Sequence, residues 1–222
     1  MIADLQHCNP LLFDEFLTAK RQSEGIAHVV RSSARFPLCG RGDINTYPIF
    51  AELGYTVIAL HGRSGLILPT GLVTGDATKN FFADAMTKQR IARFVGFDNE
   101  GKKLFPDIDN NLTFAAVTLA GDAVPAAAFC FNIRRFEQIG ESHRYFALNS
   151  RDLDLFNPNT RTCPIFRSTQ DALLVRQLYS QLPVLVREVA PAANPFGIEF
   201  LRMLDMANDS DLFITLEQCE EN

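Results

Sequence analysis

The chain has 222 residues, enough for one large domain or two small ones, and its formal net charge is −5. Hydrophobic residues make up 47% and charged residues 21%, the balance of an ordinary globular protein. The negative charge argues against a free-standing nucleic-acid-binding protein, because such proteins bind largely through cations that contact phosphates. A DNA-facing surface within a larger assembly stays open.

The five cysteines and four histidines are scattered, so they form neither a disulfide framework nor a zinc pattern. The neighbours His7 and Cys8 alone suggest a metal ligand pair, and without further ligands they are a weak basis for one. Cysteine use fits a reducing cytoplasm. Residues 1–13 lack the basic start and apolar run of a signal peptide, and no apolar stretch reaches the length of a membrane span. We therefore expect a cytoplasmic protein with no membrane partner and no metal.

The first part of the chain predicts two helices with a loop between them. Residues 10–24 have helical apolar spacing, with Asn9 as cap and a proline in the first turn. Residues 33–43 predict a loop. A second helix is predicted over 44–60, capped by Asp43, although its β-prone second half is ambiguous. Its expected apolar face is Tyr47, Phe50, Leu53, Val57 and Leu60.

The stretch "GLILPTGLVTGDATKNFF" (65–82) predicts a short strand ended by Pro69, a turn, and a helix capped by Thr74 or Asp76. In α/β proteins this order presents a loop to ligands at the carboxyl end of a sheet. The residues expected to face the core from this helix are Phe81, Phe82, Ala85 and Met86.

Apolar runs further along predict three more strands, over 91–99, 112–121 and 126–133. The second of these is continuous, which predicts burial on both faces. A polar loop is predicted over 100–110. Residues 150–166 show little periodicity and predict irregular structure, and a helix is predicted over 169–182.

Three stretches resemble one family in both order and spacing: "GDINTYPIFAEL" (42–53), "SGLILPTGLVTGDATKNFF" (64–82) and "LFPDIDNNLTFAAVTLAG" (104–121). They are similar to gamma-type N6-adenine DNA methyltransferases, and in particular to the large bacterial type IIG restriction–modification enzymes, in which one chain methylates and cuts DNA. Flanking segments add to the resemblance, which covers residues 10–213. It implies an adenine-specific DNA methyltransferase core.

The resemblance also implies a fold. It implies a Rossmann-like sheet with helices on both faces, in which the last strand is antiparallel and the fifth strand lies between the fourth and the seventh. "GLILP", "IARFVGF" and "LTFAAVTL" match the fifth, sixth and seventh strands. We therefore expect an α/β fold, a partial Rossmann-like methyltransferase sheet with flanking helices and an irregular, helical C-terminal extension. The expected division is 1–42 as a helical insert, 43–135 as a partial core, and 136–222 as an extension toward a missing target-recognition domain.

The family binds S-adenosylmethionine with a glycine-containing loop after its first strand, and positions the adenine amine with an Asn-Pro-Pro-aromatic motif after its fourth. Neither motif occurs in these 222 residues. The segment "NPLLF" (9–13) lacks the second proline, and "GRGD" and "HGRSG" are ordinary turns. We expect no catalytic residue and no cofactor bound by this chain, which would be inactive alone. It is then a remnant, a subunit of a split enzyme completed in trans, or a non-enzymatic interaction module.

Phe105 matches the aromatic residue that stacks on the flipped adenine in the family. A core position at the end of a strand explains it equally well. The loop residues expected near the target base are Pro69, Thr70, Asp107, Asn110 and Asn111, and for the acidic and amide members of this loop a solvated turn is the favoured interpretation.

Arg151, Arg161 and Arg167 lie among Asn and Thr residues and are candidate contacts to the DNA backbone. They equally suit an irregular backbone that needs side-chain hydrogen bonds, which is the favoured interpretation. DNA binding by the isolated chain is expected to be weak and non-specific.

The resemblance also predicts an unpaired sheet edge, because the first four strands of the family are missing. The edge would be "GLILPTG", with Leu66 and Leu68 on an uncovered apolar flank. Either the helix over 10–24 covers it or a second chain does. A two-fold homodimer is favoured, and a complementary methyltransferase fragment is the other candidate partner.

Overall fold

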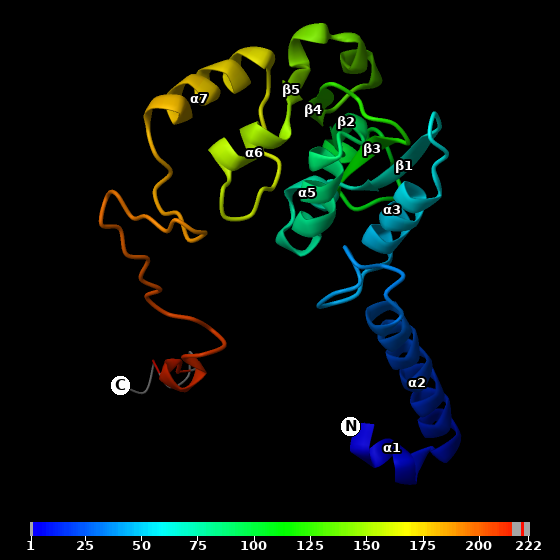
Figure 1. Ribbon diagram of the computed structural model, residues 1–222. Helices are drawn as coiled ribbons and strands as arrows, with labels where there is room; N and C mark the ends of the chain where they lie inside the picture. Colours follow the sequence, from blue (N-terminus) through cyan, green and yellow to red (C-terminus); the bar gives the residue numbers. More distant parts are fainter. Residues whose placement is uncertain (1, 215–218, 220–222) are drawn as a thin grey trace. The chain divides into compact units, whose positions relative to one another are not determined.

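The structure is a computed structural model, and it describes residues 2–214 and 219. The chain forms two compact units, 1–184 and 185–222. The first unit holds a five-stranded mixed sheet flanked by helices (Figure 1), so the α/β class is confirmed. In the described part of the second unit, the regular structure includes the 3₁₀ turn η5 (Ser210–Leu212) and one antiparallel bridge between Arg187 and Ala193. No helix within the described residues is both long and apolar enough to cross a membrane.

The sheet has the strand order β1-β3-β2-β4-β5. Its strands are β1 (Arg63–Pro69), β2 (Ile91–Asp98), β3 (Thr113–Ala120), β4 (Ala127–Ile133) and β5 (Phe146–Leu148). β3 is antiparallel to β1 and to β2, β4 is parallel to β2, and β5 is antiparallel to β4. The carboxyl ends of β1, β2 and β4 therefore share one edge with the amino end of β3. All four predicted strands are confirmed, and β5 was not predicted.

The helices are α1 (Ile2–Cys8), α2 (Pro10–Ser32), α3 (Thr46–Val57), α4 (Gly71–Thr74), α5 (Lys79–Thr87), α6 (Ser150–Phe156) and α7 (Thr169–Gln181). Short 3₁₀ turns are η1 (Asp76–Thr78), η2 (Glu100–Lys102), η3 (Phe136–Gly140) and η4 (Ser142–Arg144). The predicted cap of α2 is confirmed, since the Asn9 side chain accepts from the Leu12 amide. α2 extends beyond its predicted end and has no buried residue.

The prediction of irregular structure over 150–166 is wrong in its first part, where α6 lies. A capping box starts this helix. The Asn149 side chain accepts from the Arg151 and Asp152 amides, while the Asp152 carboxylate accepts from the Asn149 amide at 2.9 Å. Two turns are too short to show a periodic pattern, so the cap was the available signal.

The helix predicted over 44–60 is present as α3, and Tyr47 of its predicted apolar face packs against the core, but its predicted cap, its bounds and the rest of that face are wrong. Asn45, not Asp43, caps α3, because its side chain accepts from the Tyr47 amide. The buried face consists of Pro48, Ala51, Glu52 and Tyr55, whereas Phe50 and Val57 are 60% and 71% exposed. Glu52 is the reason, since its carboxylate accepts from the backbone amides of Leu38 and Cys39 and fixes the preceding loop on this face.

The helix after β1 begins later than predicted. α4 and η1 precede it, and neither Thr74 nor Asp76 caps α5. Instead the Thr78 hydroxyl donates to the carbonyls of Gly71 at 2.6 Å and Gly75 at 3.1 Å, which closes this turn. The predicted core face is confirmed: Phe81, Phe82, Ala85 and Met86 are all buried.

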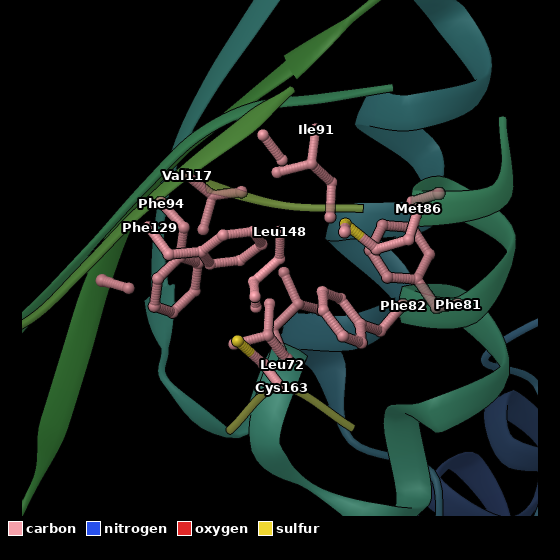
Figure 2. Packing of buried hydrophobic residues seen from close by; sticks show 14 of the residues in the cluster. Leu72, Phe81, Phe82, Met86, Ile91, Phe94, Val117, Phe129, Leu148 and Cys163 are labelled. Atoms are coloured by element: carbon pink, nitrogen blue, oxygen red, sulfur yellow. The ribbon is translucent and has the colours of Figure 1, made fainter. Parts of the chain in front are cut away.

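The two faces of the sheet carry separate cores. Figure 2 shows the larger one, in which side chains of α5 meet Phe94, Val117 and Phe129 of the sheet. The smaller core, on the other face, consists of Val95, Phe97, Cys130 and Ile133, with partly buried neighbours. The face of β3 toward the larger core is fully buried, and the face toward the smaller core is only partly buried. The predicted burial on both faces is therefore confirmed for one face.

Candidate functional site

A pocket of about 300 Å³ opens at the carboxyl end of β1 and the amino end of β3. It is lined by Ile67, Leu68, Pro69, Phe105, Ile108, Leu112, Thr113 and Phe114. Pro69 lies opposite Phe114 in the β1–β3 ladder, so the sheet itself forms the floor. Thr113 has the one polar side chain in this lining. Such a pocket suits a flat, largely apolar ligand.

Phe105 belongs both to the wall of this pocket and to an aromatic cluster. Its half-buried ring packs edge-to-face on Phe114, with centroids 4.7 Å apart. Phe114 in turn stacks on Phe97 at 5.0 Å. These contacts fix the orientation of the Phe105 ring, and the ring still lines the pocket.

Asn99 holds the loop that carries Phe105, and sequence analysis missed it. This residue follows β2 directly and is fully buried. Its carboxamide oxygen accepts from the Phe105 amide at 3.0 Å, and its nitrogen donates to the carbonyls of Phe105 at 3.0 Å and Ile108 at 3.3 Å. An asparagine at the start of a polar loop after a strand is the signal that would have identified it.

The other loop residues are divided between the pocket and the loop backbone. Pro69 lines the pocket, and the next residue, Thr70, extends the β1–β3 pairing through hydrogen bonds to Thr113. Asn110 accepts from the Gly101 amide at 2.6 Å and so stabilises the loop. Asp107 and Asn111 are exposed, and neither they nor Asn110 line the pocket.

The three candidate arginines do not share a site. Arg161 is half-buried, and its Nη2 donates to the Ser150 hydroxyl at 2.5 Å. Its Nε lies 2.8 Å from the Asp154 carboxylate but is not aligned for a hydrogen bond. These contacts favour the interpretation that Arg161 stabilises the irregular backbone. Arg151 is exposed in the first turn of α6, and Arg167 lines a separate polar pocket.

The apolar pocket does not fit S-adenosylmethionine. The ribose hydroxyls and charged amino-acid group of that cofactor need polar partners, which a lining with one hydroxyl does not supply. Within the described part of the chain, no group of three or more His, Cys, Asp or Glu side chains is placed to hold a metal ion.

No protein-family model matches the chain, and no curated protein matches it either. The methyltransferase resemblance therefore stays a prediction from the motifs.

Proposed function

We propose that this chain is the base-binding carboxyl part of an adenine-specific DNA methyltransferase core of the type IIG restriction–modification kind, inactive by itself. The observation that carries the proposal is the strand order. The resemblance implies that the fifth strand lies beside an antiparallel seventh strand. The strands that match these two are β1 and β3, which pair in an antiparallel manner. The strand expected as the sixth is β2, which pairs with the other side of β3. A partial Rossmann-like sheet accounts for this arrangement.

The pocket supports the base-binding role. Phe105 matches the aromatic residue that stacks on the flipped adenine in the family, and its ring lines an apolar pocket at the carboxyl end of β1. Extrusion is necessary for this chemistry because the exocyclic amine of adenine is unreachable inside a duplex. An aromatic ring that stacks on the base leaves the hydrogen-bonding edge of the base free. The Asn-Pro-Pro-aromatic motif, supplied by another chain, would contact that edge.

A split enzyme completed in trans is the second candidate function, and the free edge of β1 favours it. Among the described residues no strand pairs with the outer side of β1. Phe50 and Val57 of the neighbouring helix α3 are exposed, as is Ile67 of β1 at 67%. A partner that supplies the preceding strand would satisfy this edge.

Titration with 2-aminopurine riboside tests the base-binding role. The fluorescence of this adenine analogue should be quenched saturably by the wild-type chain through stacking in the pocket. Phe105→Ala should abolish the quenching. Phe136→Ala is the matched control, because Phe136 is an exposed aromatic residue of η3 that packs against Phe97 and does not line the pocket. Equal quenching by all three proteins would contradict the proposal.

Reconstitution separates the split enzyme from the remnant. The chain is mixed with a fragment that carries the cofactor loop and the Asn-Pro-Pro-aromatic motif, and methyl transfer from S-adenosylmethionine to DNA is measured. Activity that requires both chains, and that Phe105→Ala reduces, supports the split enzyme. Inactivity of the mixture leaves the remnant and the non-enzymatic interaction module as the alternatives.

A further inference from the structure

A second pocket, of about 370 Å³, lies just beyond the carboxyl end of β4. Every residue of its lining is polar, and three are arginines: Asn132, Arg134, Gln138, Arg144 and Arg167. Asp98, Glu100 and Glu141 pair with two of these arginines, so among the described residues the unpaired positive charge at the pocket is that of Arg167. Guanidinium and amide groups together favour an oxyanion ligand.

A β-bulge presents Asn132 to this pocket. Val95 pairs with Cys130 and Phe97 with Ile133, so β4 has one more residue than β2 between these pairs. Asn132 occupies the left-handed region with φ of 57°, which asparagine adopts more readily than most residues. Its side chain has no hydrogen-bond partner among the described residues. Bulges often redirect a side chain beside a functional site, and here the unpaired carboxamide lines the pocket.

The walls of the pocket are held in place before any ligand binds. Arg134 pairs with Asp98 at 3.0 Å and with Glu100 at 2.6 Å. Arg144 donates to Glu141 at 2.5 Å, a hydrogen bond that lowers the pKa of Glu141.

Three groups are left to meet a ligand. The Gln138 side chain, largely buried, accepts from the backbone amides of Arg134 and Arg135 and keeps its own amide hydrogens unpaired. The guanidinium of Arg167 has no partner within the described part of the chain, and Asn132 is likewise unpaired. Unlike the other two arginines, Arg167 therefore has its full charge available.

We propose that this pocket binds a phosphate of the DNA backbone, close to the base pocket that holds Phe105. The placement rests on the proposed function and on the sheet register. Pro69, Phe114, Phe97 and Ile133 form one row across four strands. Three inter-strand spacings separate the two ends of this row by about 14 Å. B-DNA carries a phosphate about every 3.4 Å of helix axis on each strand, so a duplex with one base extruded presents several phosphates within this span.

Fluorescence anisotropy with a labelled duplex, measured over a series of salt concentrations, tests the site. The slope of log affinity against log salt counts the phosphates neutralised, and Arg167→Gln should reduce its magnitude by about 0.9. Arg167→Lys keeps the charge and should preserve the slope. Arg21→Gln, which removes an exposed arginine of α2, is the control for net charge and should leave the slope unchanged.

Three results would overturn the phosphate site. They are an unchanged salt slope for Arg167→Gln, a reduction of the slope by the control Arg21→Gln that equals the reduction by Arg167→Gln, and no DNA binding by the wild-type chain at low salt. Inorganic phosphate that shifts the NMR signal of the Asn132 carboxamide while duplex DNA does not compete would identify free phosphate as the ligand, which also contradicts the DNA assignment. Phe105→Ala separates the two proposals, because it should lose 2-aminopurine quenching and keep the salt slope.

Discussion

Asn99 holds the loop that forms one wall of the apolar pocket at the carboxyl end of β1. Its carboxamide satisfies three backbone groups of one loop from a fully buried position. Asn99→Ala leaves those groups without their partners, so it should lower the free energy of unfolding by about 1–3 kcal/mol. Urea denaturation measures the loss, and limited proteolysis should show earlier cleavage within residues 100–112. Asn111→Ala, in the exposed part of the same loop, should change stability by less than about 0.5 kcal/mol.

Thiol labelling at neutral pH tests burial at the residue scale. Burial raises the pKa of Cys130 to about 11, and it raises that of Cys163 well above the ordinary value. Burial, and after it the Glu52 carboxylate, also raise the pKa of Cys39. A raised pKa keeps a thiol protonated and unreactive at neutral pH. Mass spectrometry should therefore find a maleimide on the exposed Cys8 and Cys219, and on all five cysteines after denaturation. Rapid native labelling of Cys163 would show that the core is open.

At the scale of elements, the end of β3 packs so closely on the turn before β1 that only glycine fits. A Cβ on Gly121 would lie 1.8 Å from the Ala59 carbonyl oxygen and 2.7 Å from that of Leu60. Gly121→Ala must therefore displace backbone, and it should cost about 1–3 kcal/mol of stability. Thermal denaturation checks this. Gly65→Ala in β1 is the matched control, because its Cβ would meet no atom within 4 Å. Equal melting temperatures for the two variants would contradict the packing at this turn.

At the scale of the whole molecule, the free edge of β1 is the feature from which we predict assembly. The expected uncovered flank at Leu66 and Leu68 needs correction, since Leu68 is buried and Leu66 packs against the core of the same chain. What stays open is the backbone edge and Ile67 on the opposite face. Helix α2, which was the alternative cover, has no buried residue.

We therefore expect a homodimer in the absence of a complementary fragment, and Ile67→Lys should shift it toward monomer because a charge on an edge strand opposes pairing. Light scattering after size exclusion measures the mass. Ile165→Lys, a similarly exposed isoleucine before α7, should leave the mass unchanged. A wild-type monomer at every concentration would contradict the dimer.

The amino-acid sequence by itself determined the four main strands, the helix α7 and the core face of α5. Alternating apolar residues and helical spacing are local patterns, and α5 buries its apolar side as its pattern predicts. In α7 the helix forms as predicted, but Leu173, Leu174 and Leu178 stay exposed. The motif resemblance also singled out Phe105 and Pro69, which line one pocket.

Only the tertiary structure decided which residues meet. The buried face of α3 depends on Glu52. Its carboxylate accepts from the amides of Leu38 and Cys39, which lie 14 and 13 residues earlier in a separate loop. Asn132, at the β4 bulge, and Arg167, just before α7, line the same polar pocket although they lie far apart in the chain. Such contacts depend on strand order and on hydrogen bonds between segments distant in the chain, and no local periodicity records them.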